Sequence, residues 1–244
     1  MCWGSAKCLQ GGYSEDNTPK LKEQQVDTCE ELVRHYETES DDFLQRLVTG
    51  VESWVHYFQP ETKRASKEWC HSTSPKPKKF RTQPSTGKVM LTLFWDNRGP
   101  VIEHSMPRGT TVTSASYRDL LKNHLKPAIR SKRRGLLSTG ILLQHDNVRP
   151  YTACATAATI EDMHFECLPH PSYSPDLTPS DYHILGPLKE TLGGTTFRSD
   201  EEVQEAVHEC LHKQPKEFFF PRGIQASVNC WKKCIERNGD YVEK

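Results

Sequence analysis

The stretch Gly140-Ile-Leu-Leu-Gln-His-Asp146-Asn147-Val-Arg149-Pro150 decides the fold, because it joins a short apolar strand to a polar turn. Ile141–Gln144 has the length and apolar content of a buried strand, so Asp146 follows where that strand ends. A second stretch, Pro169-His-Pro-Ser-Tyr-Ser-Pro-Asp-Leu-Thr-Pro179-Ser180-Asp181, leads into a predicted helix and places Asp181 at its start. Two carboxylates on separate elements are the arrangement by which proteins hold Mg²⁺ for phosphoryl transfer.

The elements predicted around these motifs alternate in a mixed order. Helices are expected over 26–36 and 42–47, followed by strands over 47–58, 88–96 and 101–105, a helix ending at 130, a strand over 141–144, a helix over 152–164, a strand over 165–168 and helices over 180–192, 201–213 and 223–236. This order predicts one mixed sheet flanked by helices, with strand ends and one helix start around a single crevice.

The composition excludes several classes of protein. Basic and acidic residues balance at 32 each, so net charge gives no argument for a nucleic-acid partner. Nine cysteines contain no Cys-x-x-Cys pair, which disfavours a disulfide framework and a zinc knuckle, and Cys230 and Cys234 are read as thiols on one helix face. No signal peptide and no apolar run of about 20 residues is present. A cytosolic or nuclear protein without a membrane span is expected.

Positive charge is nevertheless concentrated locally. One basic cluster holds Lys76, Lys78, Lys79 and Arg81, and another holds Lys126, Arg130, Lys132, Arg133 and Arg134. Such clusters neutralise phosphates regardless of the global sum, although a solvated charged surface is an equal alternative for each. The first cluster lies in Gln59–Lys88, which is too long for an ordinary connection and is expected to be functional or disordered.

Both aspartate motifs resemble those of the mariner-type (Tc1/mariner superfamily) DNA transposases. The shared patterns are His-Asp-Asn-x-Arg-Pro at 145–150 and Tyr-Ser-Pro-Asp-Leu-x-Pro-Ser-Asp-Tyr-His at 173–183. Asp146 and Asp181 enclose 34 residues, which is the spacing of the family's second and third catalytic aspartates. The resemblance runs from about Leu21 to Lys244 and includes the ending that starts at Trp231.

This resemblance implies an RNase H-like α/β fold over residues 21–244, preceded by a disordered tail over 1–20. It implies that Asp146 and Asp181 are catalytic and bind Mg²⁺ or Mn²⁺ for DNA strand cleavage and transfer, with water or a 3′-hydroxyl as nucleophile. Gln59–Lys88 corresponds to the family's clamp loop, which reaches a partner subunit, so a homodimer in the nucleus is the implied assembly. The family's helix-turn-helix modules are expected to be absent, because too few residues precede Leu21. The residues expected at DNA are Lys76, Lys78, Lys79, Arg81, Asn147 and Arg149.

The chain departs from the family at the first catalytic position. The family motif Thr-Gly-Asp-Glu-x-Trp corresponds to Thr49-Gly-Val51-Glu52-Ser-Trp54, so Val51 replaces the first aspartate. Valine offers no lone pair, and Glu52 is expected to face the other side of the sheet because strand residues alternate. We therefore expect an impaired nuclease with residual non-specific DNA binding. The alternatives are a weak Mg²⁺- or Mn²⁺-dependent endonuclease using Asp146 and Asp181, and a domesticated dimerisation or interaction module without catalysis.

Each singled-out residue also has a purely structural interpretation. Asp146 could close an Asx turn, and Asp181 could sit at a helix start because the helix dipole favours a carboxylate there. Asn147 and Arg149 could brace their own loop rather than meet a phosphate. His145 is expected to be packed and hydrogen-bonded rather than to bind metal, and Asp176 to cap a turn.

Overall fold

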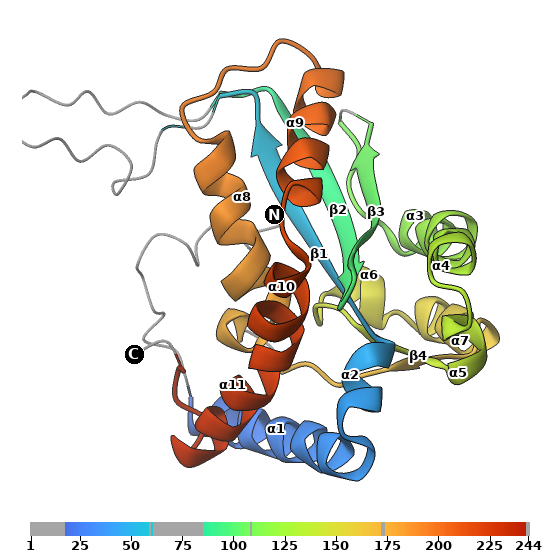
Figure 1. The fold of residues 1–244 in the computed structure, drawn as a ribbon, viewed down its shortest axis with the longest axis vertical. Helices are drawn as coiled ribbons and strands as arrows, with labels where there is room; N and C mark the ends of the chain where they lie inside the picture. The colour runs from blue at the N-terminus through green and yellow to red at the C-terminus, as the bar shows by residue number, and fades with distance from the viewer. Residues whose placement is uncertain (1–17, 59, 61–84, 108, 172–173, 243–244) are drawn as a thin grey trace, which may run out of the picture.

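The computed structural model describes residues 18–58, 60, 85–107, 109–171 and 174–242 (Figure 1). Its centre is a five-stranded sheet in the order β3-β2-β1-β4-β5. β1 pairs antiparallel with β2 and parallel with β4, β2 pairs antiparallel with β3, and β4 pairs parallel with β5. This is the predicted mixed sheet of an RNase H-like fold. The strands are β1 (Leu47–His56), β2 (Lys88–Asp96), β3 (Gly99–Met106), β4 (Ile141–Gln144) and β5 (Phe165–Cys167).

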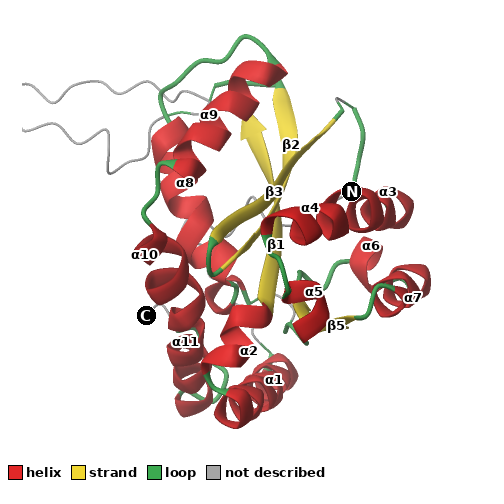
Figure 2. Ribbon diagram, turned by 45° about the vertical axis from the view of Figure 1, so that its right-hand side comes forward, coloured by secondary structure: helices red, strands yellow, loops and turns green. Residues whose placement is uncertain are grey.

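Helices cover both faces of the sheet (Figure 2). On one face the apolar side chains of β1, such as Val51 and Val55, join a core with α1, α2, α8, α9 and α11. On the other face Val48 and Phe94 pack with α3, η1, α4, α6 and α7. None of the described helices has the length and apolar content needed to cross a membrane.

The helical elements and turns have the following bounds: α1 (Pro19–Glu39), α2 (Asp41–Arg46), α3 (Ser114–Asp119), η1 (Leu120–Leu125), α4 (Lys126–Lys132), α5 (Leu136–Thr139), α6 (Arg149–Thr152), α7 (Cys154–Asp162), η2 (Pro175–Leu177), η3 (Ser180–Ile184), α8 (Leu185–Leu192), α9 (Asp200–His212), α10 (Lys216–Phe219), η4 (Phe220–Ile224) and α11 (Gln225–Glu236).

The first helix begins earlier than the sequence analysis placed it. The hydroxyl of Thr18 accepts a hydrogen bond from the backbone N–H of Leu21, and Pro19 occupies the first helical position. A hydroxyl cap followed by proline is a helix start signal, because proline lacks the N–H that a first turn leaves unbonded. Pro19 and Lys20, which were assigned to the disordered tail, therefore belong to α1. Residues 1–17 lie outside the described part of the chain.

The predicted clamp-type loop, Gln59–Lys88, lies mostly outside the described residues, and with it Lys76, Lys78, Lys79 and Arg81. Only its two ends are described. The hydroxyl of Ser85 accepts from the N–H of Phe58 at 3.0 Å and donates to the carbonyl of Gly87 at 2.8 Å. Lys88 then begins β2, as predicted. Both ends of this segment are thus hydrogen-bonded to each other at the end of the β1–β2 pair.

A buried ion pair holds α4 against the β2–β3 turn. The carboxylate of Asp96 is 1% exposed and accepts from the Arg133 guanidinium at 2.5 Å (Nε) and 3.0 Å (Nη2). The ammonium of Lys132 donates to the carbonyl of Val101 at 2.8 Å. Lys132 and Arg133, two members of the second predicted basic cluster, therefore bind oxygen atoms of the fold itself. Arg133 is thus not available to contact a phosphate.

Asp96→Asn should lower the free energy of unfolding by about 3 kcal/mol, because it leaves a buried guanidinium without its counter-charge. Urea unfolding of the two proteins measures the difference. The matched control is Glu209→Gln, which breaks the exposed pair between Glu209 and Lys213 and should leave the unfolding midpoint unchanged. Equal effects of the two substitutions would show that the Asp96–Arg133 pair does not anchor α4.

Candidate active site

Asp146 stands just beyond the end of β4. The parallel pairing ends with Thr49 opposite Gln144, and β1 continues while β4 stops. Two residues after the Thr49–Gln144 pair, Val51 in β1 and Asp146 beyond β4 occupy corresponding positions. Their side chains therefore belong to the same face of the sheet. Asp146 is exposed, and its Oδ1 accepts from the N–H of Asn147 at 2.7 Å. The hydrogen bond expected of an Asx turn is thus present. It uses Oδ1, one of the two carboxylate oxygens of Asp146.

Asp181 comes from η3, which is anchored on the same face. The indole N–H of Trp95 donates to the hydroxyl of Ser180 at 2.9 Å, and the hydroxyl of Thr49 lies 3.4 Å from it. Ser180 and Thr49 are fully buried, so Asp181 follows a fixed point on the sheet. Burial, together with the negative charge of Asp146, raises the pKa of Asp181 to about 6. The fold therefore brings the two predicted aspartates into electrostatic contact.

Val51 belongs to the hydrophobic core. Its side chain is 8% exposed and joins the apolar cluster that includes Leu188 of α8. The position predicted for the family's first aspartate is thus occupied by a buried aliphatic side chain. It provides packing and no metal ligand.

Glu52 interacts electrostatically with both aspartates, which strand alternation alone does not predict. Burial, together with the charges of Asp146 and Asp181, raises the pKa of its carboxyl to about 7. Tyr151 of α6 hydrogen-bonds to this carboxyl and acts in the opposite direction. Glu52 does point to the other face from Val51, but β4 has already ended at this level, so no strand residue separates Glu52 from Asp146.

Lys189 and His170 also belong to the site, although the sequence analysis assigned neither a role. Lys189 on α8 is half-buried, which lowers its pKa, while the charge of Asp181 opposes that shift. His170 places Nε2 3.0 Å from the hydroxyl of Thr178. Burial lowers the pKa of His170 to about 4 against the charge of Asp146. The sequence feature that could have indicated His170 is its position between two prolines inside the second motif.

Two other motif residues are structural, as predicted. His145 has Nδ1 2.8 Å from the hydroxyl of Tyr117 and Nε2 3.1 Å from the Sγ of Cys167, and burial lowers its pKa to about 4. Asp176 is buried in the turn η2 and accepts from the N–H of Val242 at 2.7 Å, which ties the C-terminal segment to the second motif. Neither side chain is left for metal binding.

The donor set fits a hard divalent cation incompletely. Asp146, Asp181 and Glu52 supply carboxylate oxygens, the ligands that Mg²⁺ and Mn²⁺ prefer. Burial and, after it, mutual repulsion raise the pKa values of Asp181 and Glu52, and a bound cation relieves such repulsion. Val51, on the face of Asp146, offers no ligand atom. Asn147 and Arg149 are exposed on the loop that follows Asp146, where a phosphate backbone could reach them.

Comparison with known proteins gives concordant matches. Residues 59–139 match the family described as "Transposase (partial DDE domain)". The Mariner Mos1 transposase of Drosophila mauritiana is 34% identical over 223 residues, which is 91% of this chain and 63% of that protein. The histone-lysine N-methyltransferase SETMAR of Homo sapiens is 29% identical over 98% of this chain and 34% of that protein. The chain thus spans less than two thirds of the length of these relatives.

Solved structures give the same result. The catalytic domain of Mos1 mariner transposase covers 95% of this chain with a TM-score of 0.78 and 31% identity, and the whole of that domain is matched. The Mos1 paired-end complex with Mn matches over 100% of this chain and 68% of that chain, with a TM-score of 0.84 and 32% identity. The corresponding complex with Mg covers 99% of this chain and 69% of that chain, with a TM-score of 0.85 and 32% identity.

Glu52→Gln should stabilise the protein at alkaline pH. The pKa of about 7 in the folded protein exceeds the ordinary value of 4.5, so Glu52 binds its proton more tightly in the folded than in the unfolded state. The stability of the protein therefore falls as the pH rises from 4.5 to about 7. Removing the charge should add about 1–3 kcal/mol near pH 8 and almost nothing near pH 4.

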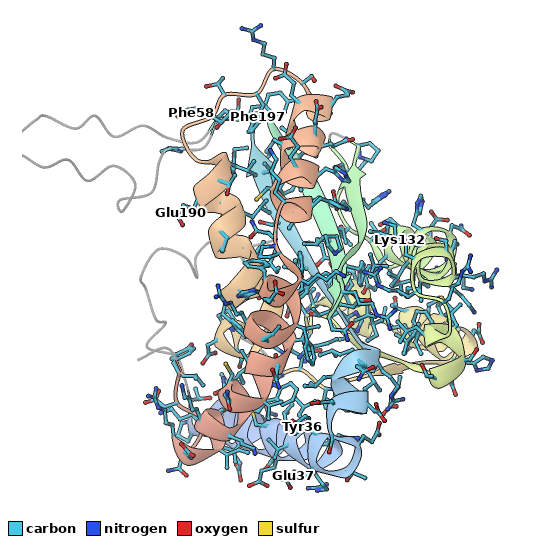
Figure 3. The ribbon with its side chains drawn as sticks, in the orientation of Figure 1. Tyr36, Glu37, Phe58, Lys132, Glu190 and Phe197 are labelled. Atoms are coloured by element: carbon cyan, nitrogen blue, oxygen red, sulfur yellow. The ribbon has the colours of Figure 1, made fainter. Side chains whose placement is uncertain are left out.

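Urea unfolding in the presence of a chelator, at both pH values, measures this effect. Glu190→Gln, an exposed carboxylate on α8 (Figure 3), is the matched control and should be neutral at both. A Glu52→Gln effect that does not change with pH would contradict the crowding of the three carboxylates.

Proposed function

We propose, because the chain belongs to the mariner-type transposase catalytic domains, that its carboxylate site derives from a metal-dependent DNA cleavage and strand-transfer site and is impaired here. The observation that carries the proposal is Val51. It lies at the position of the family's first aspartate, on the face of Asp146, and is buried in the core. A side chain without a lone pair at that place supports weak nuclease activity at most.

Asp146 and Asp181 are the residues that would hold Mg²⁺ or Mn²⁺ in this chain. The similar Mos1 structures are paired-end complexes with Mn and with Mg, which supports the same ion class here. Bound divalent ions clamp the attacking and leaving oxygens of an in-line phosphoryl displacement. Asp181 is held by the Ser180 anchor, while Asp146 stays exposed at the end of β4. Two carboxylates positioned in this way suit one ion bound weakly, not two.

Glu52 and Lys189 adjust the charge of the site. With a pKa near 7, Glu52 carries a proton part of the time at neutral pH, which limits the negative charge beside Asp146 and Asp181. Lys189 offsets the charge of Asp181 from α8. Neither replaces the missing ligand at Val51, because Glu52 approaches from the opposite face of β1.

Restoring the acid should restore activity. Val51→Asp places a carboxylate on the face that already carries Asp146 and Asp181, so Mg²⁺- or Mn²⁺-dependent nicking of DNA should rise from near background by at least about tenfold, since about 1.4 kcal/mol of transition-state stabilisation suffices for that factor. The matched control is Val51→Asn, which has the same shape without the charge and should remain inactive. A nicking assay with metal titration provides the measurement.

Two further measurements distinguish an impaired nuclease from an active one. Loss of the gained activity in the Val51→Asp, Asp146→Ala double variant is expected. Robust Mg²⁺-dependent cleavage by the unaltered chain, abolished by Asp146→Ala, would overturn the proposal that the site is impaired. It would establish the alternative, a nuclease that uses Asp146 and Asp181.

DNA binding without sequence choice is the second part of the proposal. It is supported by the Mos1 paired-end and strand-transfer complexes to which the fold is similar, and by the exposed positions of Asn147 and Arg149 beside Asp146. Arg130 and Arg134 remain exposed on the second basic cluster after Lys132 and Arg133 are used internally. Such contacts meet phosphates and carry no base information. A nuclear location and a homodimer belong to the same proposal.

Binding of this kind should weaken steeply with salt. Each phosphate contact contributes about 0.9 to the slope of log affinity against log salt, so Arg149→Ala should reduce that slope by about 1. Lys213→Ala, which removes an exposed charge just after the end of α9, is the control and should leave the slope unchanged. A salt titration by fluorescence anisotropy with two unrelated duplexes measures both. A flat slope would favour the alternative, an interaction module that does not bind DNA.

A further inference from the structure

A group of potential metal ligands lies apart from the carboxylate site, at the edge of the sheet. Glu103 of β3 and His208 and His212 of α9 offer ligand atoms that all lie within 4.8 Å of one another. Among the described residues, these three side chains form the one group of His, Cys, Asp or Glu ligands whose atoms lie this close together. Nδ1 of His208 is 3.2 Å from Oε2 of Glu103, and Nδ1 of His212 is 3.4 Å from Oε1.

The three residues lie close enough together to share one ion. Zinc–ligand bonds of about 2.0–2.1 Å place two tetrahedral ligands about 3.3–3.4 Å apart. The two histidine nitrogens approach different oxygens of the one carboxylate. The two histidines are four residues apart, so they share one face of α9, and their stacked ring centroids are 3.8 Å apart. A different face of α9 is fixed in the core by Val203, Val207 and Leu211. The histidine face is therefore held toward β3 by packing that does not involve the histidines themselves.

Glu103 is unusual for a carboxylate at a sheet edge. Its side chain is 15% exposed, whereas those of His208 and His212 are 60% and 43% exposed. Its recorded ion-pair partners among the described residues are these two imidazoles, which are charged only when protonated. A carboxylate that is largely shielded from solvent and faces two imidazole nitrogens presents ligand atoms of the kinds that a divalent cation binds.

We propose that Glu103, His208 and His212 bind Zn²⁺ or a transition ion of similar preference, with water in the fourth position. Two imidazoles and one carboxylate suit Zn²⁺, while Mg²⁺ prefers oxygen ligands alone. The ion joins the edge strand β3 to α9 and so stabilises the folded chain in proportion to its concentration above the dissociation constant. This site is independent of the proposed nuclease ancestry.

Binding requires a rearrangement of protons on both histidines. In the metal-free protein Nδ1 of His208 donates to the carboxylate of Glu103 at 3.2 Å, and Nδ1 of His212 lies 3.0 Å from the carbonyl of His208, so each of these nitrogens carries a proton. Coordination through Nδ1 moves the proton of each ring to Nε2 and gives up both contacts. The cost is two exposed hydrogen bonds, each worth about 0.5–1.5 kcal/mol, which is small beside metal–ligand bonding.

Competition of the full chain with a chromophoric zinc chelator tests the site. His208→Ala and His212→Ala should each weaken Zn²⁺ binding by roughly 10–100-fold, and Glu103→Gln should do the same, since even outer-shell changes cost that much at metal sites. His164→Asn is the matched control: it removes an exposed histidine whose φ of 59° suits asparagine, and it should leave zinc binding unchanged.

Two additional readouts exclude other zinc ligands. Exposed thiols such as Cys154 and Cys167 bind zinc in principle, so Co²⁺ is used as a spectroscopic probe. Coordination by Glu103, His208 and His212 gives no thiolate-to-cobalt charge-transfer band. The Asp146→Asn, Asp181→Asn double variant should retain the zinc equivalent and its thermal stabilisation. Zinc affinity and melting shift that persist in the His208→Ala, His212→Ala double variant, or a thiolate band in the parent, would overturn the proposal.

Discussion

Three residue pairs between parallel strands, Leu47–Thr49 of β1 with Leu142–Gln144 of β4, set the geometry on which the site depends. Because side chains alternate along a strand, this register assigns Val51 to the face of Asp146 and Glu52 to the opposite face. A slip by one residue would exchange them and would bring Glu52 to the face of Asp146. Register is fixed here by burial on both faces, since Leu47 and Val48 each enter a different core. Sliding the strand therefore cannot bring Glu52 to the place of Val51.

How far the sequence predicts the structure differs between elements for physical reasons. β2 and β4 were predicted at their observed bounds, because short apolar runs between polar turns specify buried strands. The start of α8 was less predictable: η3, a π-helical turn, precedes it and carries Asp181, and helical periodicity does not distinguish such a turn. The direction of Glu52 agrees with the prediction, but its electrostatic interaction with Asp146 and Asp181 was not predicted, because alternation gives the direction of a side chain and not its distance from groups beyond the end of the neighbouring strand.

Val51 also changes the energetics of the metal-free fold. Asp181 and Glu52 already hold protons more tightly than isolated carboxyls, since burial and neighbouring negative charge oppose their ionisation. A further carboxylate at position 51 would add to that repulsion, whereas valine adds a side chain to the core around Leu188. Crowded acidic groups lower stability, and replacing one of them by an apolar side chain often raises it. Under the proposed function Val51 fits this pattern, and the stability it confers should be largest where no divalent cation is bound.

The two groups of potential ligands differ in the way their atoms are held. Asp146 lies just beyond the end of β4 and Glu52 lies within β1, so their approach depends on loop geometry after β4. Glu103 lies within β3, and His208 and His212 lie in the last turns of α9, which packs on β3, so these atoms are held without a loop. Sites on regular elements are held more tightly than sites that include loops. The edge site is therefore preorganised by packing alone, whereas the carboxylate site needs a cation to draw its charges together.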